Sequence, residues 1–170
     1  ILTNGVNPPV ANDDAATTNE DTSTSIDVLV NDTVASGNTL TATLVDGPQH
    51  GSVEFKNGRF DYTPSANYFG SDAFSYRAND GIADSNVATV NLTINRVNDA
   101  PIGVDHTVST LEDTPYTFAE SDFGFSDPND NPANALLAVK ITTLPGAGTL
   151  TDNNVAVTAG QSVSAADIAG

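Results

Sequence analysis

The chain has 170 residues, and its 22 acidic and 5 basic residues give a formal net charge of −17. Nucleic acid and anionic membranes are excluded as partners, because both are bound through lysine and arginine, and without cysteine there are neither disulfides nor thiolate metal sites. We expect cations, basic surfaces or neutral molecules as partners, although an acidic surface can also serve solubility alone. No apolar run is long enough for insertion into a membrane.

The sequence contains an internal repeat. Glu20 and Asp21 return as Glu112 and Asp113 at an offset of 92, an offset shared by other matches and typical of a tandem array. Nothing after Gly170 matches the end of the first copy, so we expect the second copy to be incomplete. The predicted parts are a linker at 1–9, a first domain at 10–97, a short linker at 98–101 and a second domain at 102–170.

Seven short strands are predicted in the first domain. Asn57-Gly58 supplies the two positive φ angles of a tight type I′ hairpin turn, and Asn79-Asp80-Gly81 is a second turn signal. Strands at this spacing, without any helical period, favour an antiparallel β-sandwich of the Ig-like kind. The strands are expected to start near Val10, Thr24, Thr39, Gly51, Arg59, Asp72 and Val87.

Apolar residues in these segments alternate with polar ones, which indicates strands with one buried face. The aromatic residues in the middle of the domain fall mostly on the inward phase, so we expect them in the core rather than on a sugar-stacking surface. The sets expected to share a buried face are Ile26, Val28 and Val30; Leu40, Ala42 and Leu44; Phe74, Tyr76 and Ala78; and Val90, Leu92 and Ile94. The aromatic residues are Phe55, Phe60, Tyr62, Tyr68, Phe69, Phe74 and Tyr76.

The second domain is predicted to repeat this architecture without its last strands. Because the missing strands would leave inner faces uncovered, we expect weak packing there. Its strands are predicted at His106 to Thr110, Tyr116 to Ala119, Leu136 to Thr143, Gly148 to Thr151 and Val155 to Thr158. The fold class is therefore all-β, with two tandem seven-stranded antiparallel Ig-like or cadherin-like sandwiches, the second truncated.

Acidic and amide residues gather where the two domains meet in sequence. Successive loops of a sandwich alternate between its poles, so two groups of oxygen ligands are expected to face each other without a nearby lysine or arginine. Calcium takes about 6–8 oxygen ligands from such groups and would neutralise them. The predicted calcium ligands are Glu20, Asp21, Asp72, Asn98, Asp99, Asp127, Asn129 and Asp130.

Each Asp-Asn pair also has a plainer explanation, because both residues stabilise turns through their own side chains. We favour the turn for Asn31-Asp32 and for Asn79-Asp80-Gly81. For Glu20, Asp72, Asp99 and Asp127 we favour the metal, which makes residues 98–101 a calcium-binding linker.

The first copy resembles the cadherin-like, immunoglobulin-like tandem repeats of large bacterial surface adhesins, many of them RTX proteins. The second is similar to a sister type, through Phe125 to Asp130 and Leu144 to Leu150. This resemblance implies extracellular modules stacked end to end on neighbouring repeats and stiffened by calcium at the joints. It is carried in the first copy by Asn19-Glu20-Asp21-Thr22, Tyr62-Thr63-Pro64, Asn67-Tyr68-Phe69-Gly70, Asp72 to Tyr76, Asn79-Asp80-Gly81 and Val97-Asn98-Asp99-Ala100-Pro101.

The leading hypothesis is a calcium-stiffened extender of a secreted or cell-surface bacterial adhesin, acting in adhesion or biofilm formation. The alternative is a calcium-dependent polysaccharide-binding module, in which exposed Tyr68, Phe69 or Tyr116 would stack on sugar rings. An enzyme is not expected, because His50 and His106 lie in different copies and no nucleophile or phosphate-binding motif is present.

Overall fold

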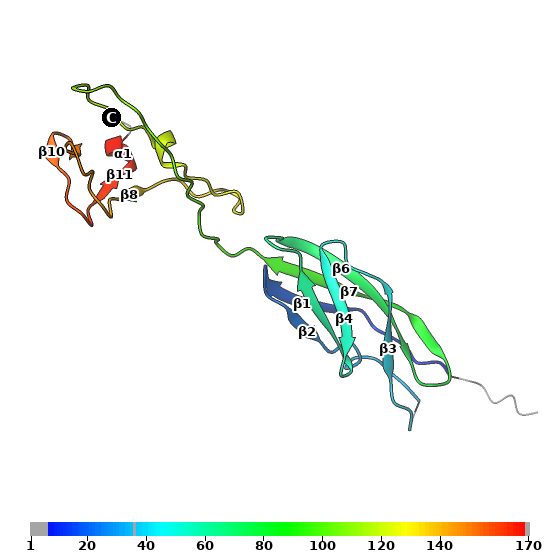
Figure 1. Cartoon of the computed structure of the whole chain (residues 1–170). Coiled ribbons are helices and arrows are strands. Elements are labelled where there is room, and N and C mark those ends of the chain that lie inside the picture. The colour runs from blue at the N-terminus through cyan, green and yellow to red at the C-terminus, as the bar shows by residue number, and fades with distance from the viewer. Residues whose placement is uncertain (1–6, 36, 169–170) are drawn as a thin grey trace, which may run out of the picture. The chain divides into compact units, whose positions relative to one another are not determined.

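The computed structural model describes residues 7–35 and 37–168. The chain divides into two compact units, Ile1–Val97 and Asn98–Gly170 (Figure 1). Most of the predicted linker at 1–9 lies outside the described residues.

The first unit is a sandwich of two sheets (Figure 1), with strand orders β1-β7-β6-β3 and β2-β5-β4. The seven predicted strands are confirmed, and the largest error in a start is four residues, at β1. The strands are β1 (Asp14–Asn19), β2 (Thr24–Ile26), β3 (Thr41–Asp46), β4 (Gly51–Lys56), β5 (Arg59–Pro64), β6 (Gly70–Asn79) and β7 (Asp84–Asn95).

One strand pair corrects the prediction of a purely antiparallel sandwich. β1 pairs with β7 in parallel, with Asp14 opposite Val90 and Asn19 opposite Asn95. Seven strands that alternate in direction leave the first and the seventh running the same way. When these two meet at a sheet edge, their pairing is therefore parallel.

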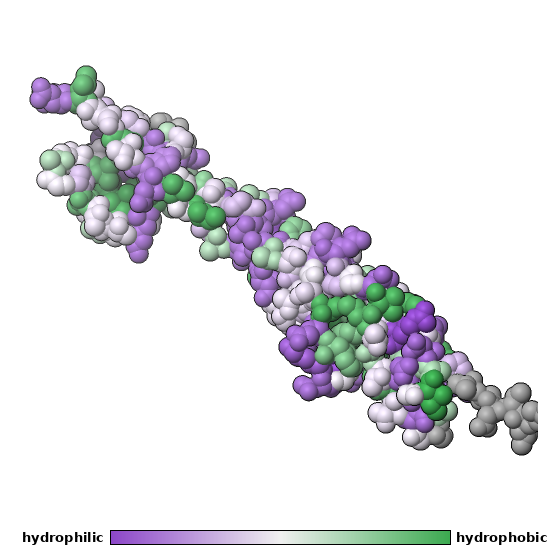
Figure 2. All heavy atoms as spheres, turned by 45° about the vertical axis from the view of Figure 1, so that its right-hand side comes forward, coloured by the Kyte–Doolittle hydropathy of each residue, from purple (hydrophilic) through white to green (hydrophobic). Residues whose placement is uncertain are grey.

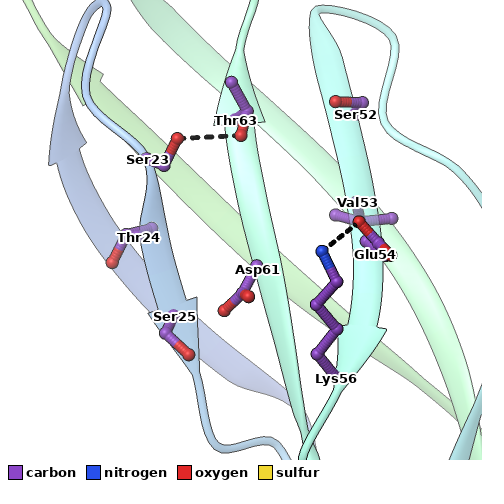
Figure 3. A pocket seen from close by; sticks show the side chains of 9 residues that line it. All are labelled: Ser23, Thr24, Ser25, Ser52, Val53, Glu54, Lys56, Asp61 and Thr63. Carbon is purple, nitrogen blue, oxygen red and sulfur yellow. Dashed lines mark hydrogen bonds and ion pairs between the residues drawn. The ribbon is translucent and has the colours of Figure 1, made fainter.

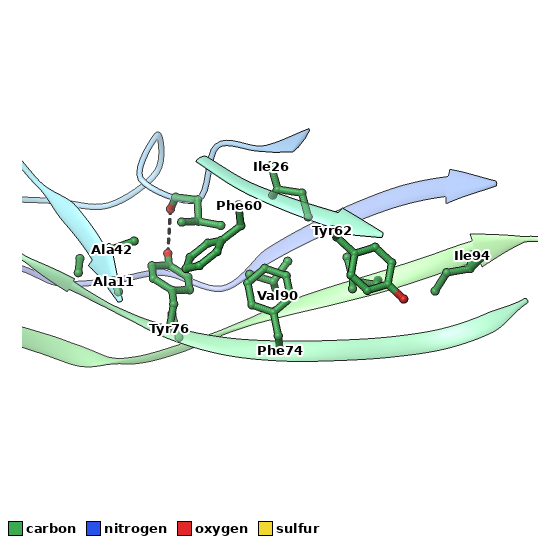
Figure 4. Close-up of a cluster of buried hydrophobic side chains, with 13 residues drawn as sticks. Ala11, Ile26, Ala42, Phe60, Tyr62, Phe74, Tyr76, Val90 and Ile94 are labelled. Atoms are coloured by element: carbon green, nitrogen blue, oxygen red, sulfur yellow. Dashed lines mark hydrogen bonds between the residues drawn. The ribbon is translucent and has the colours of Figure 1, made fainter. Parts of the chain in front are cut away.

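The core lies between the two sheets and is rich in aromatic side chains (Figure 4). Phe60 contacts Phe74 edge to face, with ring centroids 5.2 Å apart, a favourable geometry for aromatic pairs. Tyr62 and Tyr76 are fully buried beside them. The predicted inner faces of β6 and β7 are confirmed, because Phe74, Tyr76, Ala78, Val90, Leu92 and Ile94 are all buried.

Three residues predicted to be inside are exposed. Val30 is 77% exposed because β2 ends at Ile26, and beyond a strand the alternation no longer sets a face. Leu44 lies at a register shift of the edge strand β3. Phe55 lies on the edge strand β4, where its ring contacts that of Phe60.

The hairpin between β4 and β5 follows the sequence closely. Lys56 pairs with Arg59 across the turn, and Asn57 and Gly58 have φ angles of 51° and 83°, as a type I′ turn requires. The predicted turn between β6 and β7 is also present, with Gly81 at φ 85°.

The second unit is less regular than predicted, and the prediction of a second sandwich is wrong for its described residues. Two-stranded sheets pair β9 with β10 and β8 with β11. The segments 106–110 and 116–119, predicted as strands, contain no strand. The elements are η1 (Glu120–Phe123), β8 (Ala138–Lys140), β9 (Thr151–Asp152), β10 (Val155–Ala156), β11 (Ser162–Ser164) and a one-turn helix α1 (Ala165–Ile168).

The expected weak packing of the second unit is confirmed. Val157 is the buried apolar side chain among its described residues, while Leu111, Leu137 and Val155 are between 69% and 83% exposed. Figure 2 shows hydrophobic residues at the surface of this unit. No helix in the described part of the chain is long and apolar enough to cross a bilayer.

Candidate functional site

Glu20 is a buried carboxylate at the end of β1, where it ties the start of the first unit to its end. Its backbone N–H donates to the carbonyl of Asn95 at 2.8 Å, and its Oε1 accepts a short hydrogen bond from the N–H of Val97. The side chain is 3% exposed, and its second oxygen, Oε2, is buried without a hydrogen-bond partner. No donor in the part of the chain that the structure describes reaches this oxygen.

Asp72 is also buried, but both of its oxygens are engaged. Oδ1 accepts from the N–H groups of Gln49 and Ala73 at 2.9 Å. Oδ2 accepts from the N–H of His50 at 2.9 Å and from the hydroxyl of Tyr62 at 3.0 Å. Burial alone would raise the pKa of Asp72, but these bonds outweigh it and lower the pKa. The geometry supports a structural role and gives no support to the predicted metal role.

Asp21 is exposed and forms part of a turn. It has a positive φ of 56°, and its Oδ1 accepts from the N–H of Asn67 at 3.0 Å. One carboxylate oxygen is thus already committed to positioning the neighbouring loop.

The second unit brings four of the predicted ligands together around Asn134. The Nδ2 group of Asn134 donates to Asn98 Oδ1 at 2.9 Å and to Asp130 Oδ2 at 3.3 Å. Its backbone N–H donates to Asp127 Oδ2 at 2.6 Å, and the N–H of Asp99 donates to Asp130 Oδ2 at 3.1 Å. This acidic loop cluster therefore comprises Asn98, Asp99, Asp127, Asp130 and Asn134.

Asp127 is the deepest carboxylate of the acidic loop cluster together with Asp130, each being 6% exposed. Its Oδ1 is buried without a hydrogen-bond partner, which matches the state of Glu20 Oε2 in the first unit. Asn129, another predicted ligand, is half-buried in the same loop.

The two buried oxygens, Glu20 Oε2 and Asp127 Oδ1, are relevant to calcium binding. A buried carboxylate oxygen without a donor costs about 1–3 kcal/mol or more, and a hard cation offers it a partner. In the described residues, however, no three or more acidic, histidine or cysteine side chains are placed to bind one ion together. The residues fit calcium as individual oxygen ligands rather than as a complete preformed cage.

Asn134 was missed by sequence reasoning. The signal that could have found it is the amide-rich run from Asn129 to Asn134, which begins two residues after Asp127 and contains Asp130. Asparagine both ligates calcium and links neighbouring carboxylates by hydrogen bonds.

A second oxygen-rich group surrounds the buried hydroxyl of Tyr76. This hydroxyl lies 2.8 Å from the carbonyl of Val28 and between 3.1 and 3.2 Å from Asp14 and Asp32. Burial raises the pKa of Tyr76 and of Asp14. Asp32 Oδ1 also accepts from the N–H of Asn12 at 2.8 Å, so the interpretation of Asp32 as a structural turn residue agrees with its contacts.

The turn at Asn79-Asp80-Gly81 likewise has the contacts of an ordinary turn. Asp80 Oδ1 accepts from the N–H groups of Ile82 and Ala83 at 3.0 and 2.9 Å, and these bonds, led by that of Ala83, lower the pKa of Asp80.

The aromatic residues considered for sugar stacking are only partly available. Tyr68 is half-buried and stacks on His50, with ring centroids 4.0 Å apart and planes inclined by 6°. Phe69 is half-buried. Tyr116 is 39% exposed, and its hydroxyl donates to Asp122 at 3.0 Å.

A shallow hollow of about 660 Å³ lies on the outer face of the β2-β5-β4 sheet (Figure 3). Eight of its nine lining residues have polar side chains, Val53 being the exception. Ser23 and Thr63 share a hydrogen bond of 2.8 Å, and Lys56 pairs with Glu54 at 2.6 Å. Asp61 lies between these groups on β5. Hydroxyl and carboxylate groups in such a hollow suit a ligand that itself carries hydroxyl groups.

A family model described as a bacterial Ig domain matches residues 6–93, just over half of the 170 residues. The chain belongs to the bacterial Ig domain family. The two-sheet sandwich of the first unit is the bacterial Ig domain itself, and the acidic loop cluster lies outside the matched residues. The resemblance to Ig-like repeats is thereby confirmed at the level of the family, and the finer assignment to adhesin repeats stays a prediction.

Curated relatives of this bacterial Ig domain protein include three integrin beta-like proteins of Dictyostelium discoideum. Protein C is 32% identical over 111 residues, 64% of this chain. Protein E is 36% identical over 100 residues and protein B is 44% identical over 52 residues. The chain spans 6% or less of the length of these relatives.

Among solved structures, an endo-fucoidan hydrolase of glycoside hydrolase family 107 aligns with 57% of this chain and 15% of its own. The sequence identity is 23% and the TM-score is 0.43. The hydrolase activity belongs to that protein, and at this level of similarity it says nothing about the bacterial Ig domain.

Proposed function

We propose that this chain is a calcium-stiffened extender module of a secreted or cell-surface bacterial protein that acts in adhesion or biofilm formation. Bacterial Ig domains are typical of surface and secreted protein modules and are typically non-catalytic. Beyond this property of the family, we propose that the chain binds calcium and acts as an extender.

The observation that supports calcium is the pair of buried, unpartnered carboxylate oxygens, Glu20 Oε2 and Asp127 Oδ1. Both belong to residues singled out in the sequence for their oxygen-ligand chemistry. Calcium would give these oxygens a partner, and its flexible coordination accepts ligands from amides and backbone carbonyls as well.

The residues that would bind calcium are Glu20 in the first unit and the acidic loop cluster in the second. Asp21 and Asp72 are left out of this set. One oxygen of Asp21 already accepts from the N–H of Asn67, and the two oxygens of Asp72 already accept four hydrogen bonds. We further propose that bound calcium limits the motion between neighbouring units, as predicted from the repeat.

Calcium titration of the intact chain tests this proposal. Thermal unfolding in calcium is expected to occur at a higher temperature than in EDTA, because a ligand of the folded state stabilises it by mass action. Small-angle scattering should report a narrower distribution of chain dimensions with calcium. Magnesium at equal concentration is the control for charge screening, because magnesium demands stricter octahedral geometry. Identical melting and scattering with and without EDTA would sink the proposal.

The second candidate function is binding of a neutral polysaccharide, and the polar hollow on the β2-β5-β4 sheet favours it. Serine, threonine and carboxylate groups can exchange hydrogen bonds with sugar hydroxyls. A glycan array probed with the wild type and with Asp61→Ala tests it. Glycan binding by the wild type that is lost in the variant would support this candidate. No binding of the wild type to any glycan on the array would count against it.

A further inference from the structure

Three steps in the described part of the chain place a glycine directly after an asparagine or aspartate, at 46–47, 57–58 and 80–81. At such a step no Cβ hinders the approach of the glycine nitrogen to the preceding side chain. The carboxylate of Asp80 accepts three hydrogen bonds, and that of Asp46 accepts one from Ser75. The fold therefore holds both of these side chains in place.

Asn57 differs from the two aspartates. It is exposed at the tip of the β4–β5 hairpin, and its side chain makes no hydrogen bond to any described residue. The N–H of Gly58 likewise has no acceptor among these residues, and a Cβ added at Gly58 would meet nothing within 4 Å. Neither the asparagine amide nor the glycine nitrogen is therefore held by contacts like those of Asp46 and Asp80.

We propose that Asn57-Gly58 is a site of spontaneous deamidation, at which the chain modifies its own hairpin turn. Asparagine is among the chemically labile residues. This modification does not depend on calcium or on the extender role.

The reaction needs only water. The nitrogen of Gly58 loses its proton and forms a bond to the side-chain carbonyl carbon of Asn57. The bond from that carbon to the amide nitrogen breaks, ammonia leaves with the proton, and a five-membered succinimide ring remains. Water then opens the ring at one of its two carbonyl carbons. The product is aspartate or a β-linked aspartate, in which the main chain runs through the former side chain.

The type I′ turn controls when the ring can close. In such a turn the residue at the position of Asn57 has a ψ angle of about +30°, which directs the following nitrogen away from the asparagine side chain. Ring closure therefore requires the hairpin tip to open. Local opening costs little at loop tips, and β4 is an edge strand that pairs with β5 alone. We expect the folded chain to react, but more slowly than the unfolded chain.

The β-linked product cannot rebuild the turn. It adds a methylene carbon to the main chain, whereas the pairing of Lys56 with Arg59 is closed by two ordinary residues with positive φ angles. Refolding does not reverse the reaction. The end of β4 should therefore stay loosened from β5.

Peptide-resolved mass spectrometry of the intact chain, stored in EDTA at mildly alkaline pH, tests the proposal. Asn154 is the internal control, because it is also exposed in a two-residue turn with a φ of 62° but precedes Val155. Asn57 should convert about tenfold faster or more, because glycine alone leaves the attacking nitrogen unhindered. The peptide map separates Asn57 from Asn4, which also precedes a glycine but lies outside the described residues.

Two comparisons connect the rate to the turn and to its glycine. Urea should speed the conversion of Asn57, because it releases the residue from the turn. Gly58→Ala, measured in urea so that hairpin stability plays no part, should slow the conversion by about tenfold or more, since a Cβ hinders the attacking nitrogen. Gly47→Ala is the matched control and should react at the rate of the wild type.

The effect on the hairpin is separated from the effect of charge by Asn57→Asp. This variant carries the new carboxylate without the β-linkage, and aspartate tolerates a positive φ. It should melt close to the wild type, whereas a stored sample enriched in the β-linked form should melt at a lower temperature. Electron-based fragmentation distinguishes the two aspartate isomers.

Any of three results would overturn the proposal. They are conversion in the folded chain that is no faster at Asn57 than at Asn154, an unchanged rate in Gly58→Ala, and a β-linked product that melts at the temperature of Asn57→Asp.

Discussion

Two buried carboxylates of the first unit are satisfied to very different degrees. Asp72 accepts four hydrogen bonds. Glu20 has one oxygen bonded to Val97 and one that has no partner among the described residues. A buried carboxylate therefore has a structural role at Asp72, whereas at Glu20 one of its oxygens can still accept a ligand.

Glu20→Gln should change stability in opposite directions with and without calcium. In EDTA the variant should melt at the same temperature as the wild type or above it, because it no longer buries an uncompensated charge. In saturating calcium the wild type should melt higher, by about 2–4 °C for each kcal/mol of binding free energy. Differential scanning calorimetry under both conditions measures the crossing.

The control for this experiment is Glu54→Gln, which removes an exposed carboxylate paired with Lys56. Its melting temperature should respond to calcium as that of the wild type does. If Glu20→Gln also keeps the full calcium response, Glu20 is not a ligand.

Asp72 should contribute to acid lability. Because its folded pKa lies below the usual 3.8, its stabilisation is complete above that value and is lost as the pH falls through the folded pKa. Asp72→Asn, which replaces an acceptor with an amide donor, should cost about 1–3 kcal/mol at neutral pH. Urea unfolding across the acid range should show this cost shrinking as the pH falls.

The stability contribution of Asp14 changes with pH in the opposite direction to that of Asp72, because burial raises the pKa of Asp14. Its contribution to the free energy of unfolding is present below pH 3.8 and is lost as the pH rises through its folded pKa.

A cost of Asp72→Asn that is independent of pH would contradict the role assigned to the Asp72 carboxylate.

At the scale of elements, the β4–β5 hairpin depends on one glycine. A Cβ added at Gly58 would meet open space, but φ is 83°, a conformation that costs a residue with a side chain about 1–2 kcal/mol. Gly58→Ala should lower the free energy of unfolding by about that amount in urea denaturation.

Gly47→Ala is the matched control, because that site has equal space without a positive φ. It should be neutral or slightly stabilising, since alanine restricts the unfolded chain. Equal effects of the two substitutions would mean that the turn conformation does not set the stability of the hairpin.

Local patterns predicted the elements of the first unit wherever the strand was long and central. β6 alternates from Ser71 to Asn79 and β7 from Val87 to Asn95, so period two identified their inner faces. β2 has only three residues. The alternation of apolar residues continues to Val30, beyond the end of the strand, and therefore does not predict burial there. Similar alternation at Leu137, Val139 and Ile141 did not produce a covered face in the second unit, because a face also needs an opposing sheet.

The acidic residues of the candidate site could be found in the sequence, but their hydrogen bonds could not. Glu20 and Asp127 stand out as acidic residues in predicted loops, and their role as calcium ligands stays a prediction. The donors to Asp72 could not be found, because Gln49 and His50 lie 23 and 22 positions away and approach it only through the fold.

At the scale of the whole molecule, the two units differ in their internal packing. Thirteen buried apolar residues form one cluster in the first unit, whereas Val157 is buried in the described part of the second. In the absence of calcium, amide hydrogen exchange should therefore be slow in β5 to β7 and fast throughout β8 to β11.

Peptide-resolved mass spectrometry of exchange measures this contrast, with β2 as an internal reference for a short edge strand. Equal protection of the two units would show that the second is stabilised by something other than apolar burial.

The parallel pairing of β1 and β7 has a mechanical consequence. The chain enters the first unit at the start of β1 and leaves it at the end of β7, so tension along the backbone pulls these neighbouring strands in opposite directions along their length. Six paired residues on each strand then resist as one group in shear, instead of opening one after another as in an unzipped hairpin. Such a module should rupture only at high force, a property that the proposed extender role would require.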